Sequence, residues 1–265
     1  MSKLEELVGA AREDVERRKT IVAVEQLREA VGTLSGSRPF SEALVRPGLS
    51  LIAEFKRRSP SAGDIAGGAD VAQVCAAYER GGAAALSVLT DRPYFGGSVA
   101  DMQVARDATG LPVLRKDFTI DEIQVYEARA IGADAVLLIC AALPDDALLA
   151  DLHALARELG MSALVETHDA AEIDRALGAA AEIVGVNSRD LATFSEDLDV
   201  AAALASRVPA GVIAVAESAI RSADDARRMA DAGFDAVLVG EALVRADDPT
   251  ALVRDLAAVP VTRRA

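Results

Sequence analysis

The 265-residue chain has no tryptophan, two cysteines and two histidines, and aromatic side chains at only 3% of its positions. Cys75 and Cys140 each lie in an apolar run, which indicates small buried side chains rather than functional thiols. So few cysteines favour a reducing, cytoplasmic location. Because His153 and His168 have no cysteine nearby, we expect no metal site. A G-x-G-x-x-G turn at the start of a helix is also missing, so nothing indicates a dinucleotide cofactor.

Positive charge is scarce as well. Lys and Arg number 28 against 42 Asp and Glu, which gives a net charge of −14. This charge repels nucleic-acid backbones and anionic lipids, so we expect neither as a partner, and an anionic small substrate would need a locally positive pocket. Residues 1–20 have the pattern of a charged amphipathic helix, not of a signal peptide, and no later apolar run is long enough to span a bilayer. The sequence leaves the oligomeric state open, and a monomer is compatible with it.

Apolar residues are abundant, at 51% of the chain, with a mean hydropathy of +0.22. From residue 49 onward, short β-branched or leucine-rich runs alternate with longer stretches of helical period, which indicates βα units. The candidate strands are 51–55, 85–89, 113–116, 135–139, 163–166, 183–187, 212–216 and 236–239. Because the strands are apolar on both faces and occur in series, they predict a closed (β/α)8 TIM barrel rather than an open sheet.

Helix starts and the amino-terminal region complete the predicted organisation. Asp121, Asp145, Asp169 and Ser222 each precede an Ala/Leu/Glu-rich segment and are typical N-cap residues. Residues 1–48 contain one expected helix over 1–20 and a second near 22–30. They bury too little surface to fold alone, so we expect a helical extension that caps the barrel, with residues 49–265 forming the eight βα units of a single domain spanning 1–265.

Polar side chains stand where the candidate strands end, which is where a parallel barrel collects its catalytic groups. They are Glu54, Lys56, Lys116, Glu166, Asn187 and Glu217. Glu54 and Lys56 are two residues apart on an extended chain, so their side chains project from the same face. For Glu54, Lys56, Lys116 or Glu166 taken alone, a structural ion pair at the strand end is the favoured interpretation. Two lysines and three carboxylates buried at one rim without a ligand would carry a large desolvation penalty, so together they predict an acid–base site.

The loops after the seventh and eighth candidate strands are where this fold often binds phosphate. They contain Ser218 with Ala219, and Gly240 with Glu241; Gly240 permits close approach of a ligand to the backbone. Further donors near the same rim are Ser59, Arg57, Arg58 and Arg189. Phe95, on a glycine-bearing loop after the second strand, fits either the wall of an apolar pocket or a simple turn. The rim therefore predicts an anion site beside the acid–base cluster.

Five motifs resemble the indole-3-glycerol phosphate synthase family, in order and over nearly the whole chain. They are Ile52–Ser61, Leu86–Asp91 with Phe95–Ser98, Pro112–Phe118, Gly185–Leu191 and Val215–Ser218. The family also carries an amino-terminal extension before its barrel. The resemblance implies ring closure of 1-(2-carboxyphenylamino)-1-deoxyribulose 5-phosphate with decarboxylation and dehydration, a step of tryptophan synthesis. Because loss of carbon dioxide restores the aromatic ring, an electron-sink cofactor is unnecessary and we expect none.

The resemblance also implies roles for individual residues. Lys116 would be the general acid that protonates the keto oxygen, with Glu166 as its partner in proton transfer. Lys56 and Glu54 would serve binding and dehydration. An apolar wall next to Lys116 is expected to lower its pKa and make it a better acid. The substrate-binding residues implied by the family are Asn187, Glu217 and Ser218 for polar groups, Ser59, Arg189, Gly240 and Glu241 for phosphate, and Phe95, Phe118, Leu137 and Leu191 for the anthranilate ring.

Two departures from the family pattern are visible, and two other functions remain open. Ala219 stands where the family usually has glycine, and Thr167 stands where an aliphatic residue is usual. An imine-forming aldolase or phosphosugar isomerase on the same fold would use Lys116 for a Schiff base or Glu166 to shuttle a proton. A non-catalytic phosphosugar-binding barrel would bind the anion at the same site but would catalyse no reaction.

Overall fold

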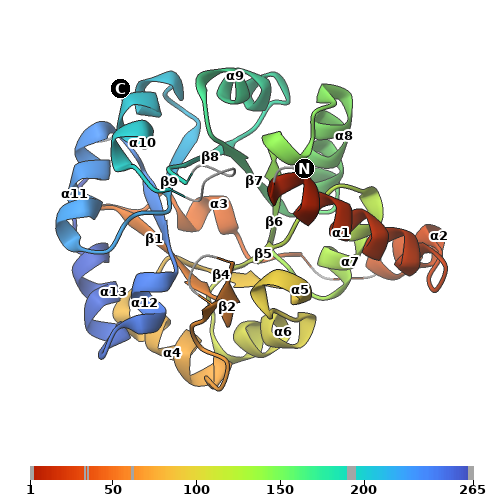
Figure 1. Cartoon of the computed structure of the whole chain (residues 1–265), viewed down its shortest axis with the longest axis horizontal. Helices are drawn as coiled ribbons and strands as arrows, with labels where there is room; N and C mark the ends of the chain where they lie inside the picture. Colours follow the sequence, from red (N-terminus) through yellow and green to blue (C-terminus); the bar gives the residue numbers. More distant parts are fainter. Residues whose placement is uncertain (1–2, 33, 35, 61–62, 190–194, 262–265) are drawn as a thin grey trace.

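The computed structural model describes residues 3–32, 34, 36–60, 63–189 and 195–261. Eight parallel strands close into a barrel in the order β1-β10-β9-β8-β7-β6-β5-β4 (Figure 1), which confirms the predicted (β/α)8 fold. Their bounds are β1 Ser50–Phe55, β4 Ala85–Leu89, β5 Val113–Lys116, β6 Ala135–Ile139, β7 Ser162–Thr167, β8 Ile183–Asn187, β9 Ile213–Glu217 and β10 Ala236–Val239. The sequence did not reveal the small antiparallel pair β2 (Arg58–Ser59) and β3 (Gly63–Asp64), because two-residue polar strands leave no period to detect.

Helices surround the barrel and connect successive strands. The outer helices are α4 Val71–Gly81, α6 Val99–Ala108, α7 Glu122–Ala130, α8 Asp146–Glu158, α9 Ala170–Gly178, α10 Leu198–Leu204, α11 Ala223–Ala232 and α13 Pro249–Ala257. The four predicted N-caps are confirmed: Asp121, Asp145 and Asp169 each accept a backbone N–H of the first turn, and Ser222 forms a capping box with Asp225. Shorter elements are α5 Arg92–Phe95, α12 Glu241–Arg245 and the 3-10 turns η1 Cys140–Ala142 and η2 Ala205–Arg207.

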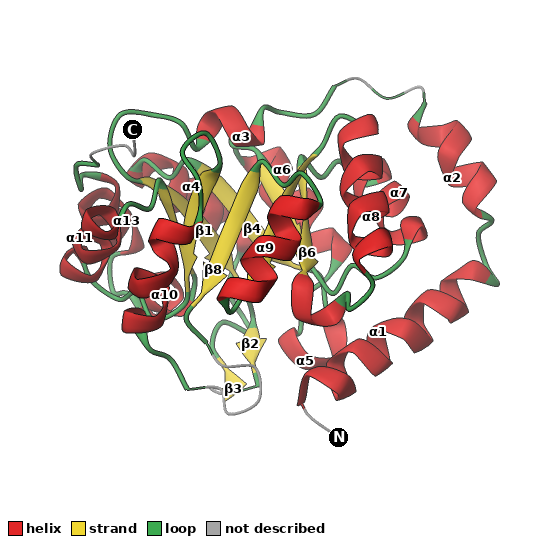
Figure 2. Cartoon of the chain, turned by 90° about the horizontal axis from the view of Figure 1, so that it is seen from above, coloured by secondary structure: helices red, strands yellow, loops and turns green. Residues whose placement is uncertain are grey.

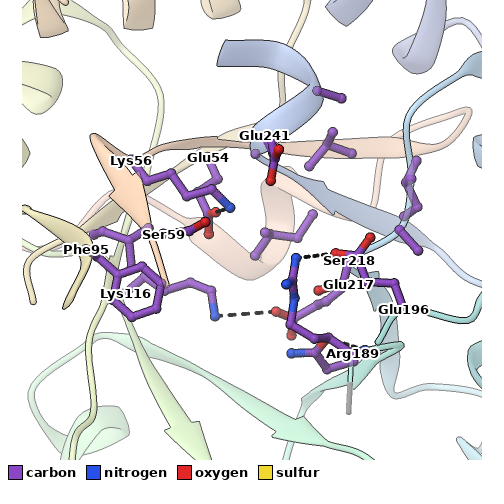
Figure 3. A pocket seen from close by; sticks show the side chains of 18 of the residues that line it. Glu54, Lys56, Ser59, Phe95, Lys116, Arg189, Glu196, Glu217, Ser218 and Glu241 are labelled. Atoms are coloured by element: carbon purple, nitrogen blue, oxygen red, sulfur yellow. Dashed lines mark hydrogen bonds and ion pairs between the residues drawn. The ribbon is translucent and has the colours of Figure 1, made fainter. Parts of the chain in front are cut away.

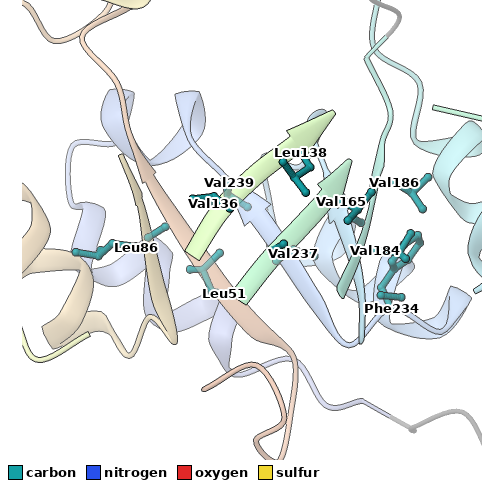
Figure 4. Close-up of a cluster of buried hydrophobic side chains, with 14 of the residues drawn as sticks. Leu51, Leu86, Val136, Leu138, Val165, Val184, Val186, Phe234, Val237 and Val239 are labelled. Atoms are coloured by element: carbon teal, nitrogen blue, oxygen red, sulfur yellow. The ribbon is translucent and has the colours of Figure 1, made fainter. Parts of the chain in front are cut away.

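Alternation along the strands divides the apolar residues between two cores. Outward-facing side chains such as Leu51, Val136 and Val237 pack against the helices (Figure 4). Inward-facing side chains such as Ile52 and Leu114 fill the inside of the barrel. Cys75 and Cys140 belong to the outer core, where burial raises the pKa of each thiol to about 12, so both behave as small apolar residues as predicted. No helix within the described ranges is long and apolar enough to cross a membrane.

The amino-terminal region reaches both ends of the barrel. Helices α1 (Lys3–Lys19) and α2 (Val24–Val31) run along α7, and α1 is held there by ion pairs of Arg18 with Glu127 and of Lys19 with Asp121, both at 2.6 Å. Helix α3 (Phe40–Ala43) lies at the opposite end of the barrel from β2 and β3 (Figure 2). There Phe40, 1% exposed, packs with the inner core and closes the end at which the strands begin.

We predict that Phe40→Ala destabilises the protein by about 3–5 kcal/mol, the usual range for removing a buried phenylalanine. The substitution would leave a cavity at the closed end of the barrel, where Phe40 packs with the inner core. Chemical denaturation monitored by circular dichroism measures the change. Ile21→Ala is the control, since that side chain is 74% exposed and its loss should change the stability by about 0.5 kcal/mol or less. A Phe40 variant as stable as this control would contradict the role assigned to α3.

Candidate active site

A cavity of about 460 Å³ opens at the carboxyl end of the barrel. Within the described ranges, every site residue predicted from the sequence lines it except Arg57 and Arg58. Leu191 lies outside the described residues. The predicted residues that line it are Glu54, Lys56, Ser59, Phe95, Lys116, Phe118, Leu137, Glu166, Asn187, Arg189, Glu217, Ser218, Gly240 and Glu241. They come from all eight strands of the barrel or the loops that follow them, as expected where parallel strands end together.

Lys116 is the centre of the polar cluster (Figure 3). Its Nζ lies 3.0 Å from Glu166 Oε2 and 3.6 Å from Glu217 Oε2, so one ammonium group serves two carboxylates from strands across the barrel. The Asn187 amide donates to Glu166 Oε1 at 3.0 Å. Because these side chains are almost fully enclosed, water screens the charges poorly and their interactions are strong.

A second pair, Lys56 with Glu54, lies next to the first. The ammonium nitrogen is 3.0 Å from Glu54 Oε1, which supports the expectation that both side chains project from the same face. The carboxylates of Glu54 and Glu217 each lie against the backbone of a neighbouring strand or of the loop that follows it, where a side chain would collide with them. A Cβ atom at Gly240 would overlap the Glu54 carboxylate, and a Cβ atom at Gly185 would overlap that of Glu217. Glycine at these two positions therefore permits the carboxylates to lie where they do.

The expected lowering of the Lys116 pKa is wrong. Burial does oppose the charge of Lys116, but the carboxylates of Glu166, Glu217 and Glu54 outweigh it and raise the pKa above its usual value. Burial likewise opposes the ionised form of Glu166, yet the ammonium of Lys116 and the ring of His168 hold the pKa of Glu166 well below its usual range. The sequence showed the apolar wall but not how closely the carboxylates surround the lysine.

Glu217 is the carboxyl group of the cluster whose negative charge is least stabilised by its surroundings. Burial and the neighbouring charge of Glu166 raise the pKa of Glu217 to about 8, against the attraction of Lys116. Its Oε1 atom is buried without a hydrogen-bond partner in the described part of the chain. Glu217 therefore takes up a proton more readily than Glu166 does.

His168 is a residue that the sequence reasoning missed as a member of the site. Its Nε2 lies 3.4 Å from Glu166 Oε1 and its Nδ1 lies 3.0 Å from Glu172 Oε2, so the ring stands between two carboxylates. Burial opposes its charge, but these carboxylates raise the pKa of His168 to about 10. The signal was present, because Glu166 and His168 are two residues apart at a strand end, the same spacing that pointed to Glu54 and Lys56.

The anion end of the cavity differs in part from the prediction. Arg57 turns away to form an ion pair with Asp101 at 2.6 Å, and Arg58 donates to the carbonyl of Tyr94 at 3.1 Å, so neither supplies charge to the cavity. Arg189 does line it, together with three charged residues that were not predicted, Glu196, Arg221 and Arg245.

The loop after β9 holds two consecutive residues in the left-handed backbone region. Ser218 has φ 67° and Ala219 has φ 61°. Side chains other than glycine are disfavoured in this region, by roughly 1–2 kcal/mol per residue. Both residues line the cavity, so the strained backbone lies at the anion end of the site.

The opposite wall of the cavity is apolar. Phe95 comes from α5, whose N-cap Asp91 accepts the backbone N–H groups of Tyr94 and Phe95. Phe118 and Leu137 join it, and Leu7 of α1 reaches the same cavity from the amino-terminal region. This wall can hold a flat aromatic group beside the lysines. Among the described residues no group of three His, Cys, Asp or Glu side chains is placed to hold a metal ion.

Comparison with known proteins decides the family. The model of the family described as indole-3-glycerol phosphate synthase matches residues 4–256. The chain belongs to this family. It is similar to an indole-3-glycerol phosphate synthase of Arthrobacter sp. (strain FB24), with 47% identity over 97% of this chain and 96% of the relative. Indole-3-glycerol phosphate synthase 2 of Streptomyces coelicolor is 50% identical over 94% of this chain and 96% of the relative.

Family membership gives the activity, which is that of an indole-3-glycerol-phosphate synthase, a carboxy-lyase of tryptophan biosynthesis acting on a phosphosugar. The aldolase, isomerase and binding-only alternatives are not supported. Solved structures of more distant proteins share the fold alone. A 3-hexulose-6-phosphate synthase of Salmonella typhimurium has a TM-score of 0.62 at 18% identity, covering 79% of this chain and 97% of that one.

We predict that His168→Gln moves the acidic limb of the pH profile of kcat/KM toward higher pH. Glu166 is held ionised partly by the imidazolium, so removing that cation raises the pKa of Glu166 and the carboxylate is protonated sooner as the pH falls. Steady-state rates across pH measure the shift. Glu172→Gln, which keeps the imidazole against Glu166, should shift the limb less. An acidic limb that stays in place in His168→Gln would contradict a link between the ring and Glu166.

Proposed function

We propose that this site closes the indole ring of 1-(2-carboxyphenylamino)-1-deoxyribulose 5-phosphate by general acid and base catalysis. The observation that supports this proposal is the contact of Lys116 with Glu166 and Glu217 between an apolar wall and an anion-binding end. A substrate that has an aromatic ring at one end and a phosphate at the other fits between these two regions, with its keto carbon near the lysine.

Lys116 is the general acid in this proposal. The ring carbon that carries the carboxylate attacks the keto carbon, and Lys116 gives its proton to the keto oxygen as that oxygen gains charge. The carboxylate then leaves as carbon dioxide, and its bonding electrons restore the aromatic ring. Because the pKa of Lys116 is raised in the free site, the lysine enters the reaction protonated. A substrate that separates Lys116 from Glu166 and Glu217 removes the attraction that raises the pKa, and so makes it a stronger acid.

The dehydration step needs an acid for the departing hydroxyl group and a base for the proton that is lost. Glu166 is ionised and lies 3.0 Å from Lys116, so it can take up that proton. Lys56, paired with Glu54 at 3.0 Å, is the second ammonium within the cavity. We assign binding and dehydration to these groups together. Asn187, Glu217 and Ser218 bind the polar groups of the sugar chain.

The two ends of the substrate bind to different walls. We assign the anthranilate ring to Phe95, Phe118 and Leu137. Leu191, which the resemblance also implies for this ring, lies outside the described residues. We assign the phosphate to Ser59, Arg189 and the backbone amides of Gly240 and Glu241, where the loop enters α12. Figure 3 shows Phe95 and Arg189 on opposite sides of the cavity, with Lys116 reaching between them.

We also propose that residues 1–265 act as one barrel domain and that one chain carries a complete site. Leu7 of α1 supports this, because the amino-terminal region contributes to the cavity wall. The two free, buried cysteines are compatible with a cytoplasmic location.

We predict that Lys116→Met lowers kcat by at least about 10²-fold, the usual scale for losing a positioned acid. The fluorescence of the indole product measures turnover. Lys19→Met is the control, because that lysine pairs with Asp121 on α7 and does not line the cavity. Near-normal turnover in Lys116→Met, or a borohydride-trapped adduct of substrate on Lys116 in the unmodified protein, would contradict the assignment.

We predict that Ala219→Gly raises the melting temperature slightly, by about 1–3 °C. Relief of the left-handed strain, ~1–2 kcal/mol, exceeds the extra entropy of glycine in the unfolded chain, ~0.4–1 kcal/mol. Calorimetry measures the shift. Ala180→Gly is the matched control, since Ala180 has φ 58° and is exposed away from the cavity. Both variants should gain stability, and only Ala219→Gly should also change KM. A loss of stability in Ala219→Gly would contradict the strain argument.

A further inference from the structure

Two arginines at the anion end of the cavity share one carboxylate. Arg221, in the loop between β9 and α11, places Nη2 2.8 Å from Glu196 Oε2. Arg189, just after β8, donates from Nη2 to the other oxygen, Glu196 Oε1. All three residues line the cavity. Figure 3 shows Arg189 and Glu196 next to Ser218, on the side of the cavity away from Phe95.

The position of Glu196 is fixed by its backbone as well as by its side chain. Arg189 and Glu196 form an isolated antiparallel bridge just before α10, which brings the two residues face to face. The side chain of Glu196 is 15% exposed and that of Arg189 is 19% exposed, so the pair is largely shielded from water, whereas Arg221 is 72% exposed. A carboxylate that uses both oxygens on two guanidinium groups occupies donors that would otherwise face an incoming anion.

The chemistry proposed above does not need Glu196. Its side chain forms ion pairs with the two arginines, whereas Lys116 and Lys56 pair with other carboxylates. Its charge nevertheless works against phosphate binding. Arg189 and Arg221 together carry two positive charges, and Glu196 cancels one of them. On the other phosphate loop, Glu241 is already balanced by Arg245 at 3.0 Å, so it leaves no excess positive charge there.

We propose that Glu196 is an internal competitor of the substrate phosphate, an inference that rests on the phosphate site assigned under the proposed function. In the free protein the Glu196 carboxylate occupies the guanidinium groups of Arg189 and Arg221. A phosphate group carries close to two negative charges and three acceptor oxygens, so it displaces the single carboxylate and takes both arginines. When the product leaves, Glu196 returns and neutralises them. Glu196 therefore sets how tightly the phosphosugar and the product are held.

The test is Glu196→Gln, which keeps the size of the side chain and one acceptor oxygen for the arginines but removes the charge. We expect inorganic phosphate, measured as a competitive inhibitor of the carboxyphenylamino substrate, to bind about 3- to 10-fold more tightly, and KM to fall in parallel. The control is Glu182→Gln. Glu182 lies before β8, at the far end of the barrel, and pairs with Arg157 at 3.0 Å, so this variant makes the same change in net charge away from the cavity. Its inhibition constant for phosphate should not change.

Arg221→Gln provides a second measurement. Alone it should weaken phosphate binding, and in combination with Glu196→Gln it should reduce the gain that Glu196→Gln gives by itself, because one of the two released donors is then missing. Weaker phosphate binding in Glu196→Gln would mean that the carboxylate orients the arginines and would overturn the proposal. An inhibition constant equal to that of Glu182→Gln would overturn it as well.

The outcome separates this inference from the proposed function. If the unmodified protein turns over the substrate and inorganic phosphate competes with it, the catalytic assignment stands whatever Glu196→Gln does. If the unmodified protein fails to turn over the substrate, the catalytic assignment fails. Direct titration of inorganic phosphate by calorimetry still measures whether removal of the Glu196 charge tightens the anion site.

Discussion

The structure of the site depends on one buried ammonium group held by carboxylates from across the barrel. Lys116 contacts Glu166 and Glu217, and each of these groups would be costly to bury alone. Together they account for the opposed pKa shifts in the cluster, with Glu166 lowered and Glu217 raised to about 8. The pKa values of two neighbouring carboxyl groups are thus shifted in opposite directions by their surroundings, a pattern typical of acid–base sites.

The barrel was predictable because its physical signal is periodic and local. Strands buried on both faces must be apolar throughout, and helices must begin at residues such as Asp145 that accept the first backbone N–H groups. Both patterns can be recognised from residues that are adjacent in the sequence. The inner closure by Phe40 was not predictable, because a four-residue helix has no period and its packing depends on contacts with strands far away in the sequence.

The residues that line the site were predictable, but the ion pairs that they form were not. The topology of a parallel barrel brings strand ends together, so listing their polar residues was enough to find Lys56, Lys116 and Glu166. Which arginine faces the cavity depends on side-chain partners, and Asp101 draws Arg57 away while Glu196 holds Arg189 at the mouth. The same limit explains the error over Lys116, since its pKa depends on distances to three carboxylates that lie on other strands.

Gly185 and Gly240 limit how this sequence can change over evolutionary time. Each lies opposite a carboxylate of the cluster, and even the smallest added side chain would collide with it. Because every other amino acid is larger, neither position can drift unless Glu217 or Glu54 moves first. Two residues without a functional group therefore determine where the carboxylates of the site can lie.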